Sequence, residues 1–138
     1  MSIGQIQEEI NRELSLLNGD AEMITFYIIS MGQKNPGMSP AEKTDEHIIR
    51  GCHSKVWLKA HAEGNRIYFS IDSNTLIAKG IGSLLIRLFN DQTPEDIMNT
   101  EINFIYKNGM ARFIGSQRML GFKAMINQMQ VFARNLTA

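Results

Sequence analysis

The sequence predicts an α+β protein in which a three-stranded antiparallel sheet is covered by helices on one face. Three observations support this prediction: apolar residues recur every three or four positions up to residue 32, alternate with polar residues between 56 and 71, and return to the helical period after 73. The expected order is two helices, three strands and three helices, which is typical of the α+β class. A chain of 138 residues can bury one ordinary core, so we expect residues 1–138 to form a single domain.

Two helices are predicted at the start of the chain. In the first, isoleucine and leucine side chains recur at steps of three and four from Ile3 to Leu17, and an Asn-Gly pair ends the pattern. Asp20 can cap the second helix, and Gly32 is placed to close it in a left-handed conformation. Because the connection is short, the two helices should pack as a hairpin.

An ordered surface loop and a small sheet are predicted next. Residues 33–46 contain two prolines, a glycine and many polar groups, which favour a loop. A β-hairpin is predicted where apolar and polar side chains alternate on either side of the turn sequence EGNR at 63–66. Ile48 and Ile49 are expected to form a short preceding strand, which places Cys52 at or near the first turn of a three-stranded meander.

Three further helices are expected after the sheet. Asp72 or Ser73 should cap a long helix whose leucine and isoleucine side chains repeat at the helical period and pack against the sheet. The sequence QTPED then indicates a short helix, with Thr93 as its cap and Pro94 at its first position. Ser116 is expected to begin a terminal helix. Its predicted inward-facing residues are Phe122, Met125, Met129, Phe132 and Leu136.

Composition and charge exclude several classes of function. The 14 basic and 14 acidic side chains balance, so no overall field would hold nucleic acid or an anionic membrane. The first residues, MSIGQIQEEINREL, carry acids and no long apolar core, unlike a secretory signal. No apolar run approaches the roughly 18 residues of a membrane span. We therefore expect a cytoplasmic protein that binds neither nucleic acid nor membrane.

The only cysteine, Cys52, lies in the sequence RGCHSK. A lone cysteine cannot form an internal disulfide or supply a thiolate cluster for a metal, so it acts singly or with another molecule. Arg50, His53 and Lys55 would stabilise the nucleophilic thiolate if a turn gathers them, and Gly51 permits such a turn. The alternative is that Cys52 is a small buried hydrophobic residue.

Several motifs, in order along the chain, carry a family resemblance. The sequence GCHSKVWL at residues 51–58 resembles the G-C-x-S-x-V-W signature of the SufE family of cysteine desulfuration proteins. Further segments are similar to other parts of the family: YIISMG at 27–32, DSNTLIAKGI at 72–81, TPEDI at 93–97, and SQRMLGFKAMI at 116–126 with its R-x-x-G. The similarity runs from about Tyr27 to Leu136 and so covers most of the chain.

The resemblance implies a SufE/IscU-like fold and a role as a sulfur acceptor. Cys52 would take the sulfane sulfur of a persulfide from a pyridoxal-phosphate-dependent cysteine desulfurase of the SufS/CsdA type, stimulate that enzyme, and pass the sulfur to an iron–sulfur scaffold complex. The pyridoxal chemistry would remain with the desulfurase, so the resemblance implies no cofactor and no metal site in this chain. It also implies no independent enzymatic turnover.

The resemblance also suggests which residues bind the partner. They are Arg50, Gly51, His53, Ser54 and Lys55 around the thiol, Asp72 and Asn74 at the strand-to-helix junction, and Arg118 in the R-x-x-G segment. Asn74 stands where family members commonly have an acid, and His53 where they often have glutamine.

Two other classes of function remain open from the residues alone. A freestanding enzyme would use Cys52 as its nucleophile with His47, His53 or His61 as the base, which requires a base within hydrogen-bond reach of the thiol and a set of oxyanion donors. A structural interaction domain would carry the thiol incidentally. The surroundings of Cys52 distinguish these possibilities.

Overall fold

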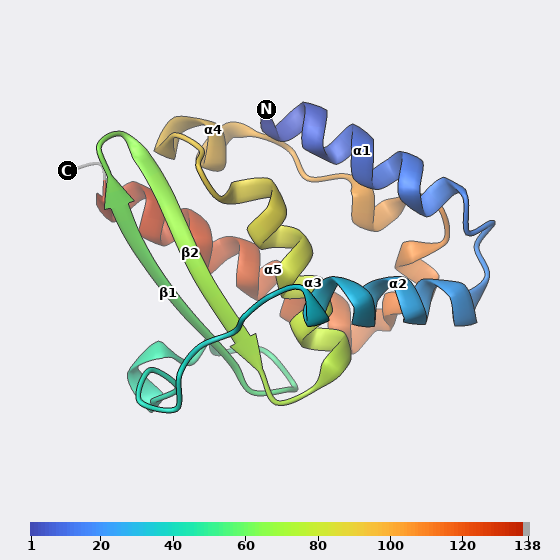
Figure 1. Ribbon diagram of the computed structural model, residues 1–138, viewed down its shortest axis with the longest axis horizontal. Coiled ribbons are helices and arrows are strands. Elements are labelled where there is room, and N and C mark those ends of the chain that lie inside the picture. Colours follow the sequence, from blue (N-terminus) through green and yellow to red (C-terminus); the bar gives the residue numbers. More distant parts are fainter. Residues whose placement is uncertain (137–138) are drawn as a thin grey trace.

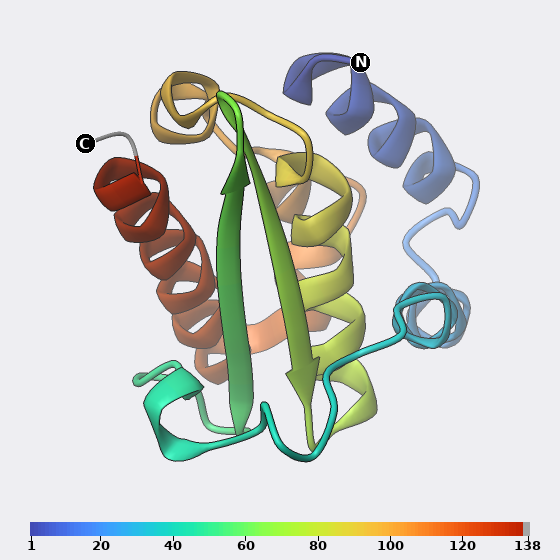
Figure 2. The ribbon, with the colours of Figure 1, turned by 60° about the vertical axis from the view of Figure 1, so that its left-hand side comes forward.

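A β-hairpin lies against two long helices in the computed structural model, which describes residues 1–136. Figure 1 shows the elements in order, and Figure 2 shows the hairpin with two helices behind it. The elements are α1 (Ile3–Ser15), α2 (Ala21–Gln33), the 3-10 turn η1 (Asp45–His47), β1 (Val56–Glu63), β2 (Arg66–Ser73), α3 (Leu76–Phe89), α4 (Pro94–Asn99), the 3-10 turn η2 (Phe104–Tyr106) and α5 (Met110–Leu136). The predicted α+β class is confirmed.

The two N-terminal helices form as predicted, with defined caps. Ser2 and Gln5 make a reciprocal capping box at the start of α1, and the Asp20 carboxylate accepts a hydrogen bond from the backbone N–H of Met23 at 3.0 Å. The prediction that Gly32 closes α2 in a left-handed conformation is wrong, because Gly32 is a buried residue within the helix.

The role of Gly32 is to let two helices approach closely. A Cβ atom at Gly32 would lie 3.1 Å from the backbone nitrogen of Gly80 in α3. A Cβ atom at Gly80 would fall well inside van der Waals contact of the Ile28 carbonyl oxygen in α2. The backbones of α2 and α3 therefore touch where both lack a side chain.

The sheet has two strands in the described residues, so the prediction of a three-stranded sheet is wrong. Strands β1 and β2 pair antiparallel from Val56 opposite Ser73 to Glu63 opposite Arg66. The expected first strand is reduced to an isolated bridge between Ile48 and Trp57. The reason is local: residues 45–47 form a 3-10 turn and the chain turns again at Gly51, so too few extended residues remain to form a strand.

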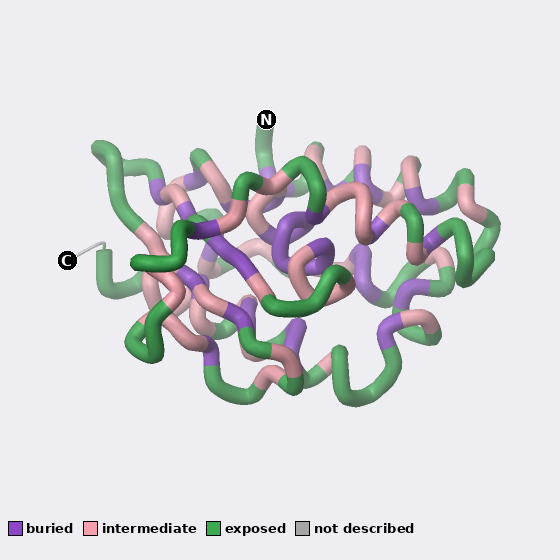
Figure 3. Tube along the Cα trace, turned by 60° about the horizontal axis from the view of Figure 1, so that its bottom comes forward, coloured by how far each residue is buried: buried purple, intermediate pink, exposed green. Residues whose placement is uncertain are grey.

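Helices cover one face of this sheet, as predicted. Helix α3 contacts β2 and α5 contacts β1, and Figure 2 shows both helices on the same side of the hairpin. The side chains on that face are buried: Val56, Leu58, Ile67, Phe69 and Ile71. Figure 3 shows buried residues concentrated in the middle of the molecule and exposed residues at loops and helix ends.

Asp72 does not cap α3, and neither does Ser73, contrary to the prediction. The N-cap position is Thr75, whose side chain makes no capping hydrogen bond. The Asp72 carboxylate turns instead toward the loop of residues 34–44, where it accepts a hydrogen bond from the backbone N–H of Met38 at 3.0 Å. Lys43 and Lys79 each approach it at 3.6 Å.

The C-terminal part of the chain follows the predicted boundaries. Thr93 caps α4 and Pro94 occupies its first turn. Helix α5 is interrupted at Gly115, which has φ 74° and ψ 173°, so a continuous helical segment begins at Ser116 as expected. The inward residues Phe122, Met125 and Met129 are buried, Phe132 is half-buried, and Leu136 is 39% exposed, against the prediction. Within residues 1–136, no helix has the length and apolar character needed to cross a bilayer.

Candidate functional site

Cys52 lies on a short loop, residues 50–55, between the isolated bridge and β1. The base of this loop is closed by a hydrogen bond of 2.8 Å from the backbone N–H of Ile49 to the carbonyl of Val56. Gly51 has φ 95°, a conformation that favours glycine, and a Cβ atom there would lie 3.4 Å from the Cβ atom of Ala124 in α5. The turn therefore brings the thiol directly beside α5.

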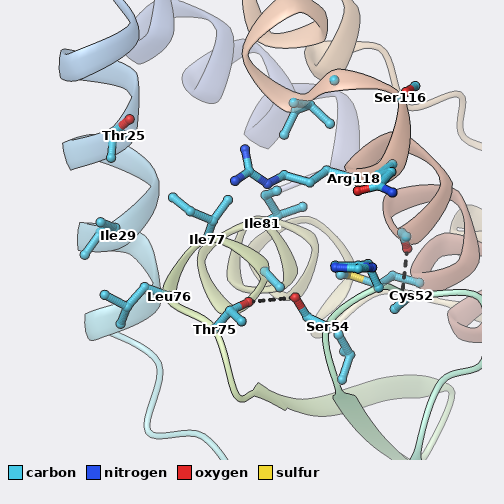
Figure 4. Close-up of a pocket in the computed structure, with 18 residues that line it drawn as sticks. Thr25, Ile29, Cys52, Ser54, Thr75, Leu76, Ile77, Ile81, Ser116 and Arg118 are labelled. Atoms are coloured by element: carbon cyan, nitrogen blue, oxygen red, sulfur yellow. Dashed lines mark hydrogen bonds between the residues drawn. The ribbon is translucent and has the colours of Figure 1, made fainter.

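The strand-to-helix junction holds the carboxyl side of the loop. The backbone N–H of Lys55 donates to the side-chain oxygen of Asn74 at 3.1 Å, and the backbone N–H of Asn74 donates to the Lys55 carbonyl at 3.2 Å. The Ser73 hydroxyl donates to the same carbonyl at 2.7 Å. The hydroxyls of Thr75 and Ser54 are hydrogen-bonded at 2.9 Å (Figure 4). We call these contacts the junction clamp.

The thiol of Cys52 is half-buried against α5. Its Sγ atom lies 3.6 Å from the carbonyl oxygen of Gly121, to which the S–H group can donate a weak hydrogen bond. A Cβ atom at Gly121 would also lie 3.6 Å from Sγ, so this glycine packs directly against the thiol. Burial raises the pKa of the Cys52 thiol above its ordinary value.

The expectation that the neighbouring cations favour the thiolate is wrong for this arrangement. Arg50, His53 and Lys55 are exposed to solvent, whereas the sulfur lies inward against Gly121. Burial is the cause of the raised pKa, and no nearby positive charge offsets it. Cys52 is therefore a neutral thiol at neutral pH in this conformation.

A groove of about 890 Å³ opens beside the thiol, between α2, the start of α3 and the break in α5. Figure 4 shows Cys52 at one side of this groove and Ile29 and Leu76 at the other. Its lining is Thr25, Ile29, Cys52, His53, Ser54, Val56, Thr75, Leu76, Ile77, Ala78, Ile81, Ile114, Gly115, Ser116, Gln117, Arg118, Gly121 and Met125. About half of these residues have apolar side chains, and none of them carries a carboxylate.

Arg118 is the residue of α5 that reaches into the groove. Figure 4 shows its side chain extending across the opening toward Ile77. Its guanidinium carbon lies 6.0 Å from the centre of the Phe113 ring, and the guanidinium group makes no ion pair or hydrogen bond with any residue from 1 to 136. This long side chain therefore places beside the groove a positive charge that has no acidic partner among the described residues.

The structure brings most of the predicted site residues together. Cys52, His53, Ser54 and Arg118 line the groove, and Lys55 and Asn74 belong to the junction clamp next to it. Asp72 is set apart, because only 6% of its surface is exposed and its carboxylate is satisfied by the 34–44 loop and two lysines. Burial alone would raise the pKa of Asp72, but the N–H groups of Met38 and Ser73, with the two lysines, lower it.

The sequence predictions missed several residues of the site. Gly121 lies in the R-x-x-G segment, and Thr75 and Leu76 lie in the strand-to-helix segment, so the family motifs contain these residues but do not indicate that they line a groove. Thr25 and Ile29 join the groove only because α2 crosses α3 at its glycines, and no local pattern marks them.

Of the three candidate bases for a freestanding thiol enzyme, His53 lines the groove with Cys52, but no hydrogen bond joins it to the thiol within residues 1–136. The Gly121 carbonyl is the hydrogen-bond partner of the sulfur, and a carbonyl cannot act as a base for a thiol proton. His47 lies 3.4 Å from Glu46, and His61 stacks on Tyr68 on the outer face of the hairpin. No cluster of three or more metal-binding side chains occurs in the same described residues.

Comparison with known proteins agrees with this architecture. The family model described as "SufE: Fe-S metabolism associated domain" matches residues 8–133, a range that contains every residue of the groove. The chain is also similar to the solution structure of a hypothetical protein from Thermus thermophilus, with a TM-score of 0.78, 16% sequence identity and 96% of each chain covered. At that identity the likeness shows the fold alone.

Proposed function

This chain belongs to the SufE family of Fe-S metabolism associated domains, and on that premise we propose that it is a sulfur carrier whose acceptor group is Cys52. The donor in this proposal is the persulfide of a pyridoxal-phosphate-dependent cysteine desulfurase of the SufS/CsdA type, and the recipient is an iron–sulfur scaffold complex. The observation that carries the proposal is the position of the lone thiol on a clamped turn at the edge of an open groove. A protein-bound persulfide can reach such a position, whereas a thiol within the core would be inaccessible.

The transfer is an exchange between two thiols. The Cys52 thiolate attacks the outer sulfur of the donor persulfide, the donor's S–S bond breaks, and the donor cysteine leaves as a thiolate. A new S–S bond joins that sulfur to Cys52. The proton that Cys52 released balances the proton that the leaving thiolate takes up. The reactants are one thiol and one persulfide, and the products are also one thiol and one persulfide. No external oxidant or reductant is therefore needed. Transfer to the recipient thiol repeats the exchange in the same way.

The raised pKa of Cys52 implies that the sulfur does not attack the donor persulfide from its position against Gly121. The Gly121 carbonyl and the burial of the sulfur favour the neutral thiol, which is a poor nucleophile. The exchange therefore requires the loop to leave Gly121 and present the sulfur to the donor. Gly51, at the amino side of the loop, is the position where the backbone has the freedom to turn.

The residues around the thiol have distinct roles in this proposal. Arg50, Gly51 and His53 are exposed and meet the desulfurase directly, together with Arg118. Ser54, Lys55 and Asn74 set the position of the loop through the junction clamp. Asp72 is buried and supports the site by holding the 34–44 loop in place, so we assign it no direct contact with the partner.

The chain has no turnover of its own in this proposal. Stimulation of the desulfurase follows because Cys52 removes sulfur from the enzyme's persulfide and frees the enzyme's cysteine for the next cycle. Specificity resides in the fit between the two protein surfaces.

The experiment that tests the proposal is intact-mass spectrometry of the chain after incubation with a SufS-type desulfurase and L-cysteine. We expect the mass of one sulfur atom to be added to the wild-type chain and to disappear on treatment with a reductant, and we expect cysteine turnover to rise. Cys52→Ser should show neither effect. Sulfur that still attaches to Cys52→Ser, or a wild-type chain that stays unmodified while the desulfurase turns over, would rule the proposal out.

A further inference from the structure

Opposite the thiol, the groove has an apolar lip that the exchange reaction does not require. Leu76, at the first position of α3, is 63% exposed, and Figure 4 shows it beside Ile29 of α2. Phe26 is 62% exposed and lies three residues before Ile29, so the two share one face of the helix. We call the exposed side chains of Leu76 and Phe26, together with the half-buried Ile29, the α2–α3 lip.

The floor of the groove continues this apolar surface inward. Ile77 and Ile81 of α3 and Ile114 and Met125 of α5 also line the groove, and the last three are buried. A volume of about 890 Å³ is in the range of pockets that take ligand groups and is too large for a packing defect. The groove can therefore accept a large apolar side chain from outside.

The groove has a positive charge in its lining, from Arg118. Lys43, Lys59 and Lys79 form ion pairs with acids elsewhere in the molecule, whereas Arg118 at the groove forms none with any described residue. Arg50, in the thiol loop, also has no acidic partner among residues 1–136. Within residues 1–136 no carboxylate lines the groove, so its complement is a surface that carries acidic groups.

From these observations we infer that the groove and the α2–α3 lip dock an extended segment of the sulfur-donating partner, with a large apolar side chain in the groove and a carboxylate beside Arg118. The inference rests on the proposed function and adds to it an apolar contact at the groove and the α2–α3 lip, separate from the thiol. A second copy of this chain is a poorer occupant, because a two-fold contact centred on the groove would bring Arg118 against its own symmetry mate. Leu76 anchors the apolar part and Arg118 orients the segment.

The test is a binding measurement by calorimetry between Cys52→Ser and a SufS-type desulfurase, because this variant binds without transferring sulfur. Adding Leu76→Glu should weaken binding about tenfold or more, since the partner's apolar side chain then meets a charge. The new carboxylate is at the first turn of α3, where an acid is compatible with the helix, so the fold should be retained. The matched control is Leu16→Glu, which changes a 79% exposed leucine outside the groove and should leave the affinity unchanged.

The charge contact is tested in the same format. Arg118→Gln should weaken binding and make it less dependent on salt concentration, because an ionic contact is lost. Arg134→Gln, an exposed arginine at the far end of α5, is the control and should retain the salt dependence of the parent.

The outcomes separate this inference from the proposed function. If wild-type protein accepts sulfur but Leu76→Glu and Arg118→Gln bind like their controls, the docking inference is wrong and the carrier function stands. If both variants weaken binding while wild-type Cys52 gains no sulfur, the docking surface stands and the carrier function is wrong. If sedimentation shows that Leu76→Glu instead dissolves a dimer of this chain, the occupant is a second copy and the inference is overturned.

Discussion

The Sγ atom of Cys52 lies 3.6 Å from the carbonyl oxygen of Gly121, a residue 69 positions later in the chain. The contact forms because the loop turns at Gly51 toward α5, where a Cβ atom added to Gly121 would be in ordinary van der Waals contact with the sulfur. A carbonyl oxygen accepts a hydrogen bond from a neutral thiol and repels a thiolate. This relationship therefore stabilises the unreactive form of the sulfur in the resting protein.

Alkylation of Cys52 should consequently require a higher pH than alkylation of an ordinary cysteine. Burial raises the pKa of the thiol above the usual value of about 8.5, so the rate with iodoacetamide should still be rising where a model thiol has reached its plateau. The same shift contributes to the free energy of unfolding. This contribution is complete below the ordinary thiol pKa and is lost as the pH rises through the higher pKa of the folded state. Rates measured by mass spectrometry across the alkaline range give the apparent pKa.

The protein unfolded in guanidinium is the control for this measurement, since its thiol is exposed to solvent. A folded-state pKa equal to or below that of the unfolded chain would contradict the buried position of the sulfur.

Removing the junction clamp should make the thiol loop more mobile. Asn74→Ala deletes the oxygen that accepts the Lys55 N–H, an interaction worth about 1 kcal/mol, so hydrogen exchange across residues 50–55 should accelerate about fivefold. Asn74→Asp retains an acceptor oxygen and should exchange like the wild type. If the wild-type loop leaves Gly121 during the exchange reaction, as the proposed function requires, hydrogen exchange should also be faster at 50–55 than in β1 and β2. Equal protection of loop and strands, with and without a desulfurase, would exclude it.

The contact between α2 and α3 should not tolerate a side chain. Gly80→Ala places a methyl group against the Ile28 carbonyl and should lower the free energy of unfolding by about 3 kcal/mol, because backbone atoms cannot move aside as a flexible side chain does. Gly4→Ala in α1 is a matched control, since its methyl group would meet only the Ser2 hydroxyl at 3.9 Å. That control should be neutral or stabilising by up to about 1 kcal/mol. Denaturant unfolding of both variants measures the difference, and equal stabilities would contradict the packing of these helices.

Asp72→Asn should destabilise the protein and reduce its sensitivity to acid. The change weakens the contacts with Lys43 and Lys79 and places an amide where two backbone N–H groups donate, at a cost of about 1–3 kcal/mol. Because the pKa of Asp72 is lowered in the folded protein, its contribution is complete above the ordinary aspartate pKa of about 3.9 and is lost as the pH falls toward the lower folded value. The free energy of unfolding of the variant, measured between pH 7 and about pH 3, should therefore fall less with decreasing pH than that of the wild type. An unchanged pH profile would mean that the carboxylate is not ionised in this network.

The elements that the sequence predicted well are those determined by neighbouring residues. Asp20 and Thr93 cap their helices because a short polar side chain reaches the backbone N–H groups of the next turn. The break before Ser116 depends on Gly115, and the hairpin on alternation around EGNR. The third strand was predicted wrongly because Ile48 and Ile49 have strand-forming side chains but are confined between a 3-10 turn and Gly51.

The site was predictable in part for the same reason. The thiol, its glycine and the cations beside it are adjacent in sequence, and Arg118 and Gly121 lie in a motif similar to one in the family. The prediction that the neighbouring positive charges stabilise the thiolate is wrong, because charges near Cys52 in sequence need not lie near its sulfur in space. They are exposed to solvent, and the sulfur contacts a carbonyl oxygen contributed by a distant helix.

By itself, the sequence determined the order and type of the helices, the N-caps of α2 and α4, the hairpin and the identity of the one thiol, because each of these depends on side chains within a few positions of one another. Only the tertiary structure decided that this thiol is held neutral, that Asp72 supports a loop rather than a helix, and that α2, α3 and α5 enclose an apolar groove beside an arginine with no acidic partner in residues 1–136. Those properties arise where segments far apart in the chain come together. Burial and charge at such contacts depend on the packing of the whole molecule, which no local pattern contains.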